Sequence, residues 1–141
     1  MVRAVAIASA LGLLAVGAVS AGPALAAAPV AGYVGWAPSS VAGCPNIQWR
    51  VARHADGSIT GIVFYSDMSG MSTVTGTEDS SGHFSVTMKN GMGNGPVGTV
   101  EGTRSADGTV EATMKGEGCA NATISIKPVK DLNALVNATG R

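Results

Sequence analysis

Residues 73–89, TVTGTEDSSGHFSVTMK, and residues 99–115, TVEGTRSADGTVEATMK, are two copies of one pattern. The copies lie 26 positions apart and share eight of their seventeen residues. A fainter copy lies at an offset of 25 residues toward the N-terminus, within Trp49 to Val63. A period of this length predicts a repeated supersecondary unit.

Each copy has the pattern of a β-hairpin. Apolar residues alternate with polar ones on both sides of a short turn, as Phe84, Val86 and Met88 do after the turn of the first copy. This alternation is typical of antiparallel strands with one buried face. We predict seven strands, at residues 46–54, 58–66, 72–78, 83–90, 97–104, 109–116 and 120–127. A parallel sheet is excluded, because no connection is long enough for a crossover helix.

The turn at residues 106–108 fixes the register of the last hairpin. A three-residue loop pairs Met114 with Val100, so that apolar residues face each other across the strands. Such a loop suits a type I turn closed by a glycine in the left-handed conformation. The same register predicts the pairs Arg104 with Val110, Gly102 with Ala112, Val51 with Gly61, Gly76 with Val86, and Val74 with Met88.

The two cysteines bear on how the sheet curls. Cys44 precedes the first strand and Cys119 precedes the last, and both lie at the same end of the sheet. In a flat sheet they would be roughly 29 Å apart, whereas a disulfide needs Cα atoms within about 7 Å. A Cys44–Cys119 disulfide therefore predicts an all-β, up-and-down antiparallel meander of 7–8 strands curled into a small barrel. A two-sheet sandwich is the alternative fold. Tyr33–Trp36 could supply an eighth strand at the seam where the sheet closes. Free thiols or half a metal site are the alternative to the bridge.

Residues 1–26 have the pattern of a secretory signal peptide. A basic start at Arg3 is followed by an apolar run to Ala21, and small residues then allow cleavage after Ala26 or Ala28. A retained membrane anchor is the alternative. We expect a secreted or periplasmic, bacterial protein, with an N-terminal segment at 27–43, the barrel at 44–128 and a tail at 129–141. Once Arg3 is removed with the signal peptide, the positive and negative charges nearly balance. This argues against nucleic acid as a partner. It also leaves no polybasic segment that would bind a membrane.

The strand at 58–66 is apolar on both faces, with Ile62 and Phe64 on the outer one. Leu132, Leu135 and Val136 in the tail have the spacing of one helix face. Asp131 fits the N-cap of such a helix. We therefore predict a short C-terminal helix on that outer face, with a frayed tail as the alternative.

The hairpin sequence Ala55–Asp56–Gly57–Ser58–Ile59–Thr60–Gly61 resembles the first hairpin of the avidin family, whose members are eight-stranded ligand-holding barrels. The resemblance covers about a dozen residues and implies an architecture. Avidin-type pockets are walled by several tryptophans on later strands. Here both tryptophans, Trp36 and Trp49, come early, so the resemblance does not imply biotin binding.

Three charged residues occupy one position of the repeat: Arg53, Glu78 and Arg104. Each lies on the predicted inner face at the turn end of its strand, so in a closed barrel they would surround one mouth. They could hold an anionic ligand, or form a structural cluster or reach into solvent. The inward repeat glycines Gly61, Gly76 and Gly102 leave space that would favour a ligand cavity.

The methionines and histidines of the chain predict no catalytic site, no metal site and no cofactor. Met68, Met71, Met88 and Met92 with a histidine could suit Cu(I), but methionines at core positions are better explained as packing. His83 opposite Asp79 resembles half a catalytic triad, yet no serine lies in a nucleophile elbow. We therefore expect a non-enzymatic binding protein whose outer face, rich in Thr, Ser and charge, contacts a protein or cell-surface partner. The alternatives are a carrier of a small anionic ligand and, less favoured, a periplasmic copper-binding protein.

Overall fold

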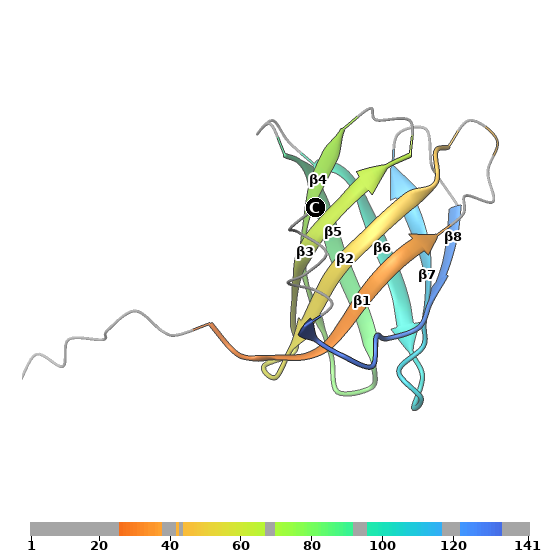
Figure 1. The fold of residues 1–141 in the computed structure, drawn as a ribbon. Coiled ribbons are helices and arrows are strands. Elements are labelled where there is room, and N and C mark those ends of the chain that lie inside the picture. Colours follow the sequence, from red (N-terminus) through yellow and green to blue (C-terminus); the bar gives the residue numbers. More distant parts are fainter. Residues whose placement is uncertain are drawn as a thin grey trace, which may run out of the picture.

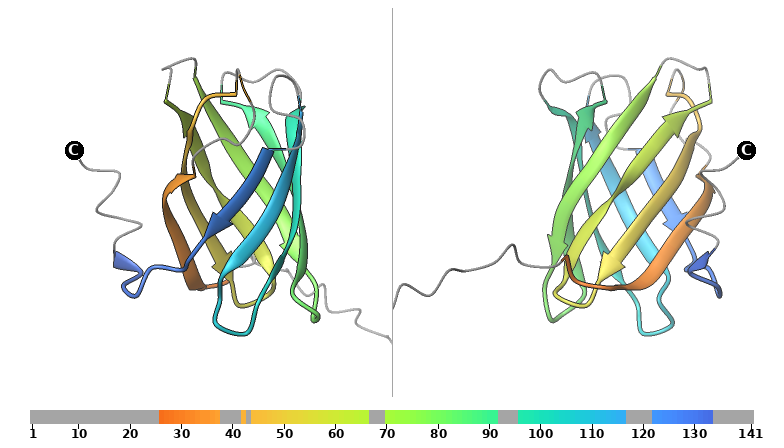
Figure 2. Two further views of the ribbon diagram at one scale, coloured as in Figure 1. Left: turned by 90° about the vertical axis from the view of Figure 1, so that its right-hand side faces the viewer. Right: turned by 60° about the vertical axis from the view of Figure 1, so that its left-hand side comes forward.

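The computed structural model describes residues 26–37, 42, 44–66, 70–91, 96–116 and 122–133. They form one sheet of eight antiparallel strands whose order in space is their order in the chain. The sheet curls into a nearly closed barrel (Figures 1 and 2). This confirms the predicted barrel, and the two-sheet sandwich is not observed. The strands are β1 (Pro29–Ala37), β2 (Ile47–His54), β3 (Ser58–Tyr65), β4 (Met71–Glu78), β5 (His83–Asn90), β6 (Pro96–Arg104), β7 (Val110–Gly116) and β8 (Ala122–Ile126).

The register follows the turn chemistry. In the β6–β7 hairpin Gly108 has φ +86°, and the Asp107 carboxylate accepts a hydrogen bond from the Thr109 backbone N–H at 2.9 Å. This side-chain bond holds the turn in place and so fixes which residues face each other. The predicted pairs are confirmed: Arg104 with Val110, Gly102 with Ala112, Val100 with Met114, Val51 with Gly61, Gly76 with Val86, and Val74 with Met88.

The barrel seam lies between β1 and β8. The predicted eighth strand is confirmed there as β1, which is longer than expected and pairs with β2. Among the described residues β1 and β8 share no hydrogen-bonded ladder. Past β8, the Val129 N–H donates to the Gly32 carbonyl at 2.8 Å. Figure 1 shows this blue segment running past the lower end of β1.

The inner face forms the core, with Val63, Val74, Met88 and Met114 almost completely buried. On the outer side of β3 the Arg50 guanidinium lies 5.2 Å from the centre of the Phe64 ring, within the range of a cation–π contact. The described residues contain no helical element, and most of the predicted C-terminal helix falls beyond Asn133, outside them. No helix in the described part of the chain is long and apolar enough to span a bilayer.

Several predictions concern residues outside the described ranges. They include the signal peptide up to Leu25 and one partner of the disulfide, Cys119. Cys44 is buried beside the core, 8% exposed, but no pair of cysteines within disulfide distance lies among the described residues. The bridge therefore stays a prediction.

Candidate functional site: a charged cluster at one barrel mouth

The predicted charged residues do meet at one mouth of the barrel. Arg53 lies near the end of β2, Glu78 ends β4, and Arg104 ends β6. The repeat period spans two strands, so equivalent positions fall on every second strand, with all three turns at the same end. Neighbouring equivalents are therefore about 10 Å apart along the sheet, a gap that long side chains can bridge.

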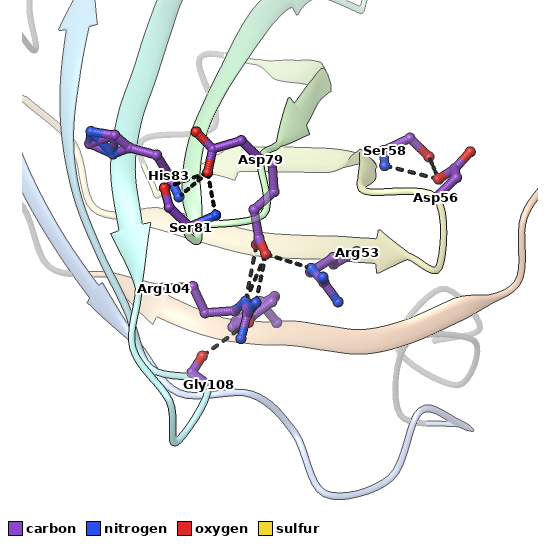
Figure 3. Close-up of polar contacts among 10 residues, drawn as sticks. Arg53, Asp56, Ser58, Asp79, Ser81, His83, Arg104 and Gly108 are labelled. Carbon is purple, nitrogen blue, oxygen red and sulfur yellow. Dashed lines mark hydrogen bonds and ion pairs between the residues drawn. The ribbon is translucent and has the colours of Figure 1, made fainter.

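Glu78 accepts hydrogen bonds from both arginines, whose side chains are labelled in Figure 3. Arg53 Nε donates to Glu78 Oε1 at 2.9 Å. Arg104 Nε lies 3.0 Å from both carboxylate oxygens, and its Nη2 donates to Oε1 at 2.7 Å. The structure thus brings all three predicted residues into one cluster with a net charge of about +1, since two guanidiniums face one carboxylate.

Burial and charge act in opposite directions on Glu78. Its side chain is 3% exposed, against 25% for Arg53 and 26% for Arg104. Burial raises the pKa of the carboxyl, but the hydrogen bonds and charges of the two arginines outweigh this effect and hold the pKa below its ordinary value. The bond to Glu78 in turn raises the pKa of Arg104. Glu78 is therefore an ionised carboxylate with its acceptor sites in use.

Tyr33 joins the cluster from β1, which sequence reasoning did not predict. It is 6% exposed, and its hydroxyl donates to the Gly108 carbonyl at 3.0 Å, across the seam. Burial is the largest cause of its raised pKa, which the nearby charges of Arg104, Glu78 and Arg53 modify. A buried aromatic ring with a polar tip suits a position between core and mouth. Tyr33 thereby ties β1 to the β6–β7 turn.

Below the cluster the barrel holds a small apolar cavity. Its volume is about 60 Å³, and it is lined by inward side chains that include Tyr33, Trp49, Arg53 and Phe84. Pockets for drug-sized molecules occupy roughly 300–1,000 Å³. Most of the interior is therefore filled by the protein's own side chains. The Trp49 indole N–H is buried and has no hydrogen-bond partner among the described residues.

Comparison with known protein families, curated proteins and solved structures gives no match. The hairpin that carries the resemblance to the avidin family forms the β2–β3 turn and the first half of β3. The two tryptophans lie on opposite sides of the barrel wall: Trp49 is 5% exposed in the core, and Trp36 is 56% exposed on the outside.

The repeat glycines lie on the inner face as predicted, and their cross-strand partners Val51, Val86 and Ala112 line the small cavity. A Cβ on Gly76 would come within 2.1 Å of the Ser85 carbonyl oxygen and 2.6 Å of the Val86 Cα. The equivalent Cβ atoms on Gly61 and Gly102 would meet the backbone of β2 and β7 in the same way. These glycines allow close approach of neighbouring strands in a strongly curled sheet. The expectation that they favour a ligand cavity stays a prediction.

The remaining polar candidates lie outside the barrel or outside the described residues. The His83 ring is placed to bond the Gly102 carbonyl at 3.2 Å, while the Asp79 carboxylate accepts from the backbone N–H groups of Ser81 and His83 (Figure 3). The half-triad of a His83 ring and Asp79 is therefore not formed. Met88 is buried in the core, and Met68 and Met92 are outside the described ranges. In the described part of the chain no three His, Cys, Asp or Glu residues gather as metal ligands.

A shallow groove hollows the outer face above the turns of β4, β5 and β6. Its volume is about 350 Å³, and it is lined by Thr77, Asp79, His83, Phe84, Ser85 and Glu101. Most of these side chains are hydroxyls or hydrogen-bond acceptors. Sequence reasoning assigned polar residues to this face, but the groove depends on how the strands curve and could not be located from their order.

Proposed function

We propose that this chain is an exported, non-enzymatic binding protein that contacts its partner through its outer face. The observation that carries the proposal is the filled interior, whose cavity of about 60 Å³ is several times smaller than the roughly 300 Å³ at the low end of small-molecule pockets. A partner would then bind the outer surface, where the polar residues are concentrated.

One cross-strand row on the outer face of β3 to β6 consists of hydroxyl groups. Thr60, Thr75, Thr87 and Thr99 lie opposite one another on four successive strands. Beside this row the groove adds two carboxylates, Asp79 and Glu101, of which Glu101 is paired with Lys115 at 2.6 Å. Hydroxyls and carboxylate acceptors with little net charge suit a polyhydroxylated partner, so we assign a cell-surface polysaccharide as the partner class.

Co-sedimentation with purified peptidoglycan and with cellulose tests this assignment. The mature protein should bind one of these polymers, and Ser85→Lys, which fills the groove, should weaken binding about tenfold, equivalent to about 1.4 kcal/mol. Ser125→Lys on β8 is the matched control, because Ser125 is exposed but lies outside the groove. Failure of the wild-type protein to bind either polymer, or equal losses in the two variants, would contradict the assignment.

A second candidate function is capture of a small anion at the charged mouth. It is favoured by Arg53, which uses Nε for Glu78 while its two terminal nitrogens make no hydrogen bond to the residues that the structure describes. A guanidinium with open donors can bind an oxyanion. Titration with inorganic phosphate, followed by the NMR signals of the Arg53 side chain, tests it. Saturable shifts that Arg53→Met abolishes would support anion capture, and unchanged signals would reject it.

The contacts of Ala27 and Ala28 bear on where the proposed signal peptide is cleaved. The Ala55 N–H donates to the Ala28 carbonyl at 3.0 Å, and the His54 ring lies 2.8 Å from the Ala27 carbonyl through Nδ1. Cleavage after Ala28 would remove both contacts, whereas cleavage after Ala26 keeps them. We therefore propose that the mature chain begins at Ala27.

The intact mass of the protein exported by its host tests both the cleavage and the disulfide. A chain starting at Ala27 and lighter by two hydrogens would support export with a Cys44–Cys119 bridge. A chain that retains Met1 would contradict export, and a mass that reduction leaves unchanged would contradict the bridge. Native mass spectrometry of the same sample reports whether a small molecule stays bound, which a filled barrel should not show.

A further inference from the structure

The small cavity below the charged cluster is apolar except at one point. Of the residues that line it only Arg53 is charged, and all the others are aliphatic or aromatic. Val74, Val86, Val100 and Ile124 in this lining are at most 5% exposed. An apolar cavity of this kind stays dry and takes up apolar groups that fit it. The cavity is therefore an apolar chamber with a single cation beside it.

Arg53 connects this cavity with solvent. Its side chain is 25% exposed at the mouth, yet it also belongs to the cavity lining. Its Nε donates to Glu78 at 2.9 Å, and a single dashed line reaches Arg53 in Figure 3. The two terminal nitrogens make no hydrogen bond to the residues that the structure describes. Their donors are therefore open to a ligand that enters beside Arg53.

The other polar groups near the cavity already have partners. The Tyr33 hydroxyl donates to the Gly108 carbonyl at 3.0 Å, and Arg104 contacts Glu78 at 2.7–3.0 Å. Because two guanidiniums share one carboxylate, the cluster has one positive charge in excess. A monoanion would neutralise it, whereas a dianion would leave a negative charge beside the apolar lining. A carboxylate is a monoanion whose two oxygens match the guanidinium fork.

The volume of the cavity limits the apolar part of such a ligand. An apolar cavity of roughly 150 Å³ holds a benzene molecule. By proportion, the cavity of about 60 Å³ has room for about two or three carbon atoms. A longer chain would have to displace buried valine side chains or stay outside the barrel.

We propose that Arg53 and the cavity together bind a short-chain carboxylate. The carboxylate would accept hydrogen bonds from the terminal nitrogens of Arg53, and an aliphatic tail of about two or three carbons would fill the cavity. This inference rests on the anion capture proposed for Arg53 and names the class of anion. It is compatible with a largely filled interior, because such a ligand is far smaller than the occupants of typical pockets.

Titration of the isotope-labelled mature protein with acetate, propionate, butyrate and hexanoate, at constant ionic strength, tests the role of the tail. The NMR signals of the Arg53 side chain report the carboxylate, and the methyl signals of Val74 and Val100 report the cavity. Burial of one further methylene should tighten binding about fourfold. We expect this gain at each step from acetate to butyrate and none from butyrate to hexanoate. 1-Butanol, which has the same tail as butyrate without the charge, should bind more weakly.

The outcomes separate this proposal from anion capture itself. Equal affinity for all four carboxylates, with inorganic phosphate also bound, would leave anion capture standing and overturn the role of the cavity. Steady tightening up to hexanoate would overturn it too, by assigning the tail to an outer apolar surface. Arg53 signals that respond neither to phosphate nor to any carboxylate would refute anion capture and this proposal together.

Two conservative variants form a matched pair. Val86 lines the cavity, whereas Val97 packs against the core outside that lining. Val86→Ile adds one carbon to the cavity, so butyrate should bind about fourfold more weakly while acetate binds as before. Val97→Ile should change neither affinity, and equal effects of the two variants would contradict a tail in the cavity. Arg53→Met should lower the affinity for butyrate to that for 1-butanol, a readout that needs neither isoleucine variant to fold.

Discussion

Replacing Glu78 by glutamine should destabilise the barrel by about 2–3 kcal/mol. The substitution removes the charge that two guanidiniums contact at 2.7–3.0 Å, and the side chain is only 3% exposed. Breaking a fully buried ion pair costs about 3–5 kcal/mol. The arginines are about a quarter exposed, so water screens part of the charge left on them. The loss should therefore be closer to that of a hydrogen bond to a charged group, about 1.5–3 kcal/mol.

The matched control is Glu101→Gln, the same substitution in an exposed ion pair. Glu101 lies 2.6 Å from Lys115, a distance as short as those in the cluster, but the two side chains are 51% and 58% exposed. Exposed pairs contribute little, because water screens the charges and both side chains lose freedom in pairing. The pair of variants thus separates burial from distance as the source of stability.

Urea and thermal unfolding of the two variants measure the difference. Glu78→Gln should lower the melting temperature by about 10 °C and lower the urea midpoint without changing the slope. Glu101→Gln should leave both nearly unchanged. If the two variants melt together, the buried cluster does not stabilise the barrel and the reasoning from burial is wrong.

Three further predictions concern the close strand contacts, the seam and the acid range. Gly76→Ala should lower the stability of the barrel by about 1–3 kcal/mol through overpacking, because the new Cβ would meet backbone atoms of β5. Thr75→Ala, on the exposed side of β4, is the control and should change the stability little. Equal urea midpoints for the two variants would argue against a tight strand contact. Tyr33→Phe removes the hydrogen bond to Gly108 and should lower the stability by about 1 kcal/mol, the value of one hydrogen bond. If amide exchange at the seam is unchanged, Tyr33 does not tie β1 to the β6–β7 turn. Because the pKa of Glu78 is lowered in the folded barrel, its contribution to stability is complete above the pKa of an unfolded glutamate, about 4.3, and is lost as the pH falls through the folded value. The melting temperature should therefore fall more steeply below about pH 4 in the wild type than in Glu78→Gln, and parallel curves would contradict the assignment.

The register and the charged cluster could be predicted from the sequence because both depend on local rules. A three-residue loop ending in Gly108 fixes the pairing of β6 with β7, and strand alternation then decides which side chains point inward. Arg53, Glu78 and Arg104 occupy the same position of the repeat. They therefore meet at one mouth as soon as the sheet closes into a barrel. No alignment of distant residues had to be guessed.

Tyr33 and the role of the repeat glycines could not be predicted in this way. The partner of Tyr33 is the carbonyl of Gly108, 75 positions away, and their contact depends on where the seam closes. Gly76 faces inward, as alternation requires, and its missing Cβ lets the backbone of β5 approach closely. How closely the strands approach depends on how tightly the sheet coils, which residue spacing does not specify.

The geometry of the repeat gives a reason for charged residues at the mouth of a largely apolar interior. Backbone ladders join each strand to its immediate neighbours, whereas the cluster joins β2, β4 and β6, which share no ladder. Replacing all three residues together, by Arg53→Met, Glu78→Leu and Arg104→Met, removes the cost of burying charge and should restore most of the stability lost in Glu78→Gln. If that triple variant keeps its stability but its amides near the mouth exchange faster, the cluster serves to hold alternate strands in place rather than to raise the free energy of unfolding. If exchange stays as slow as in the wild type, apolar packing suffices to close the mouth, and retention of the charges would favour the anion-binding role of Arg53.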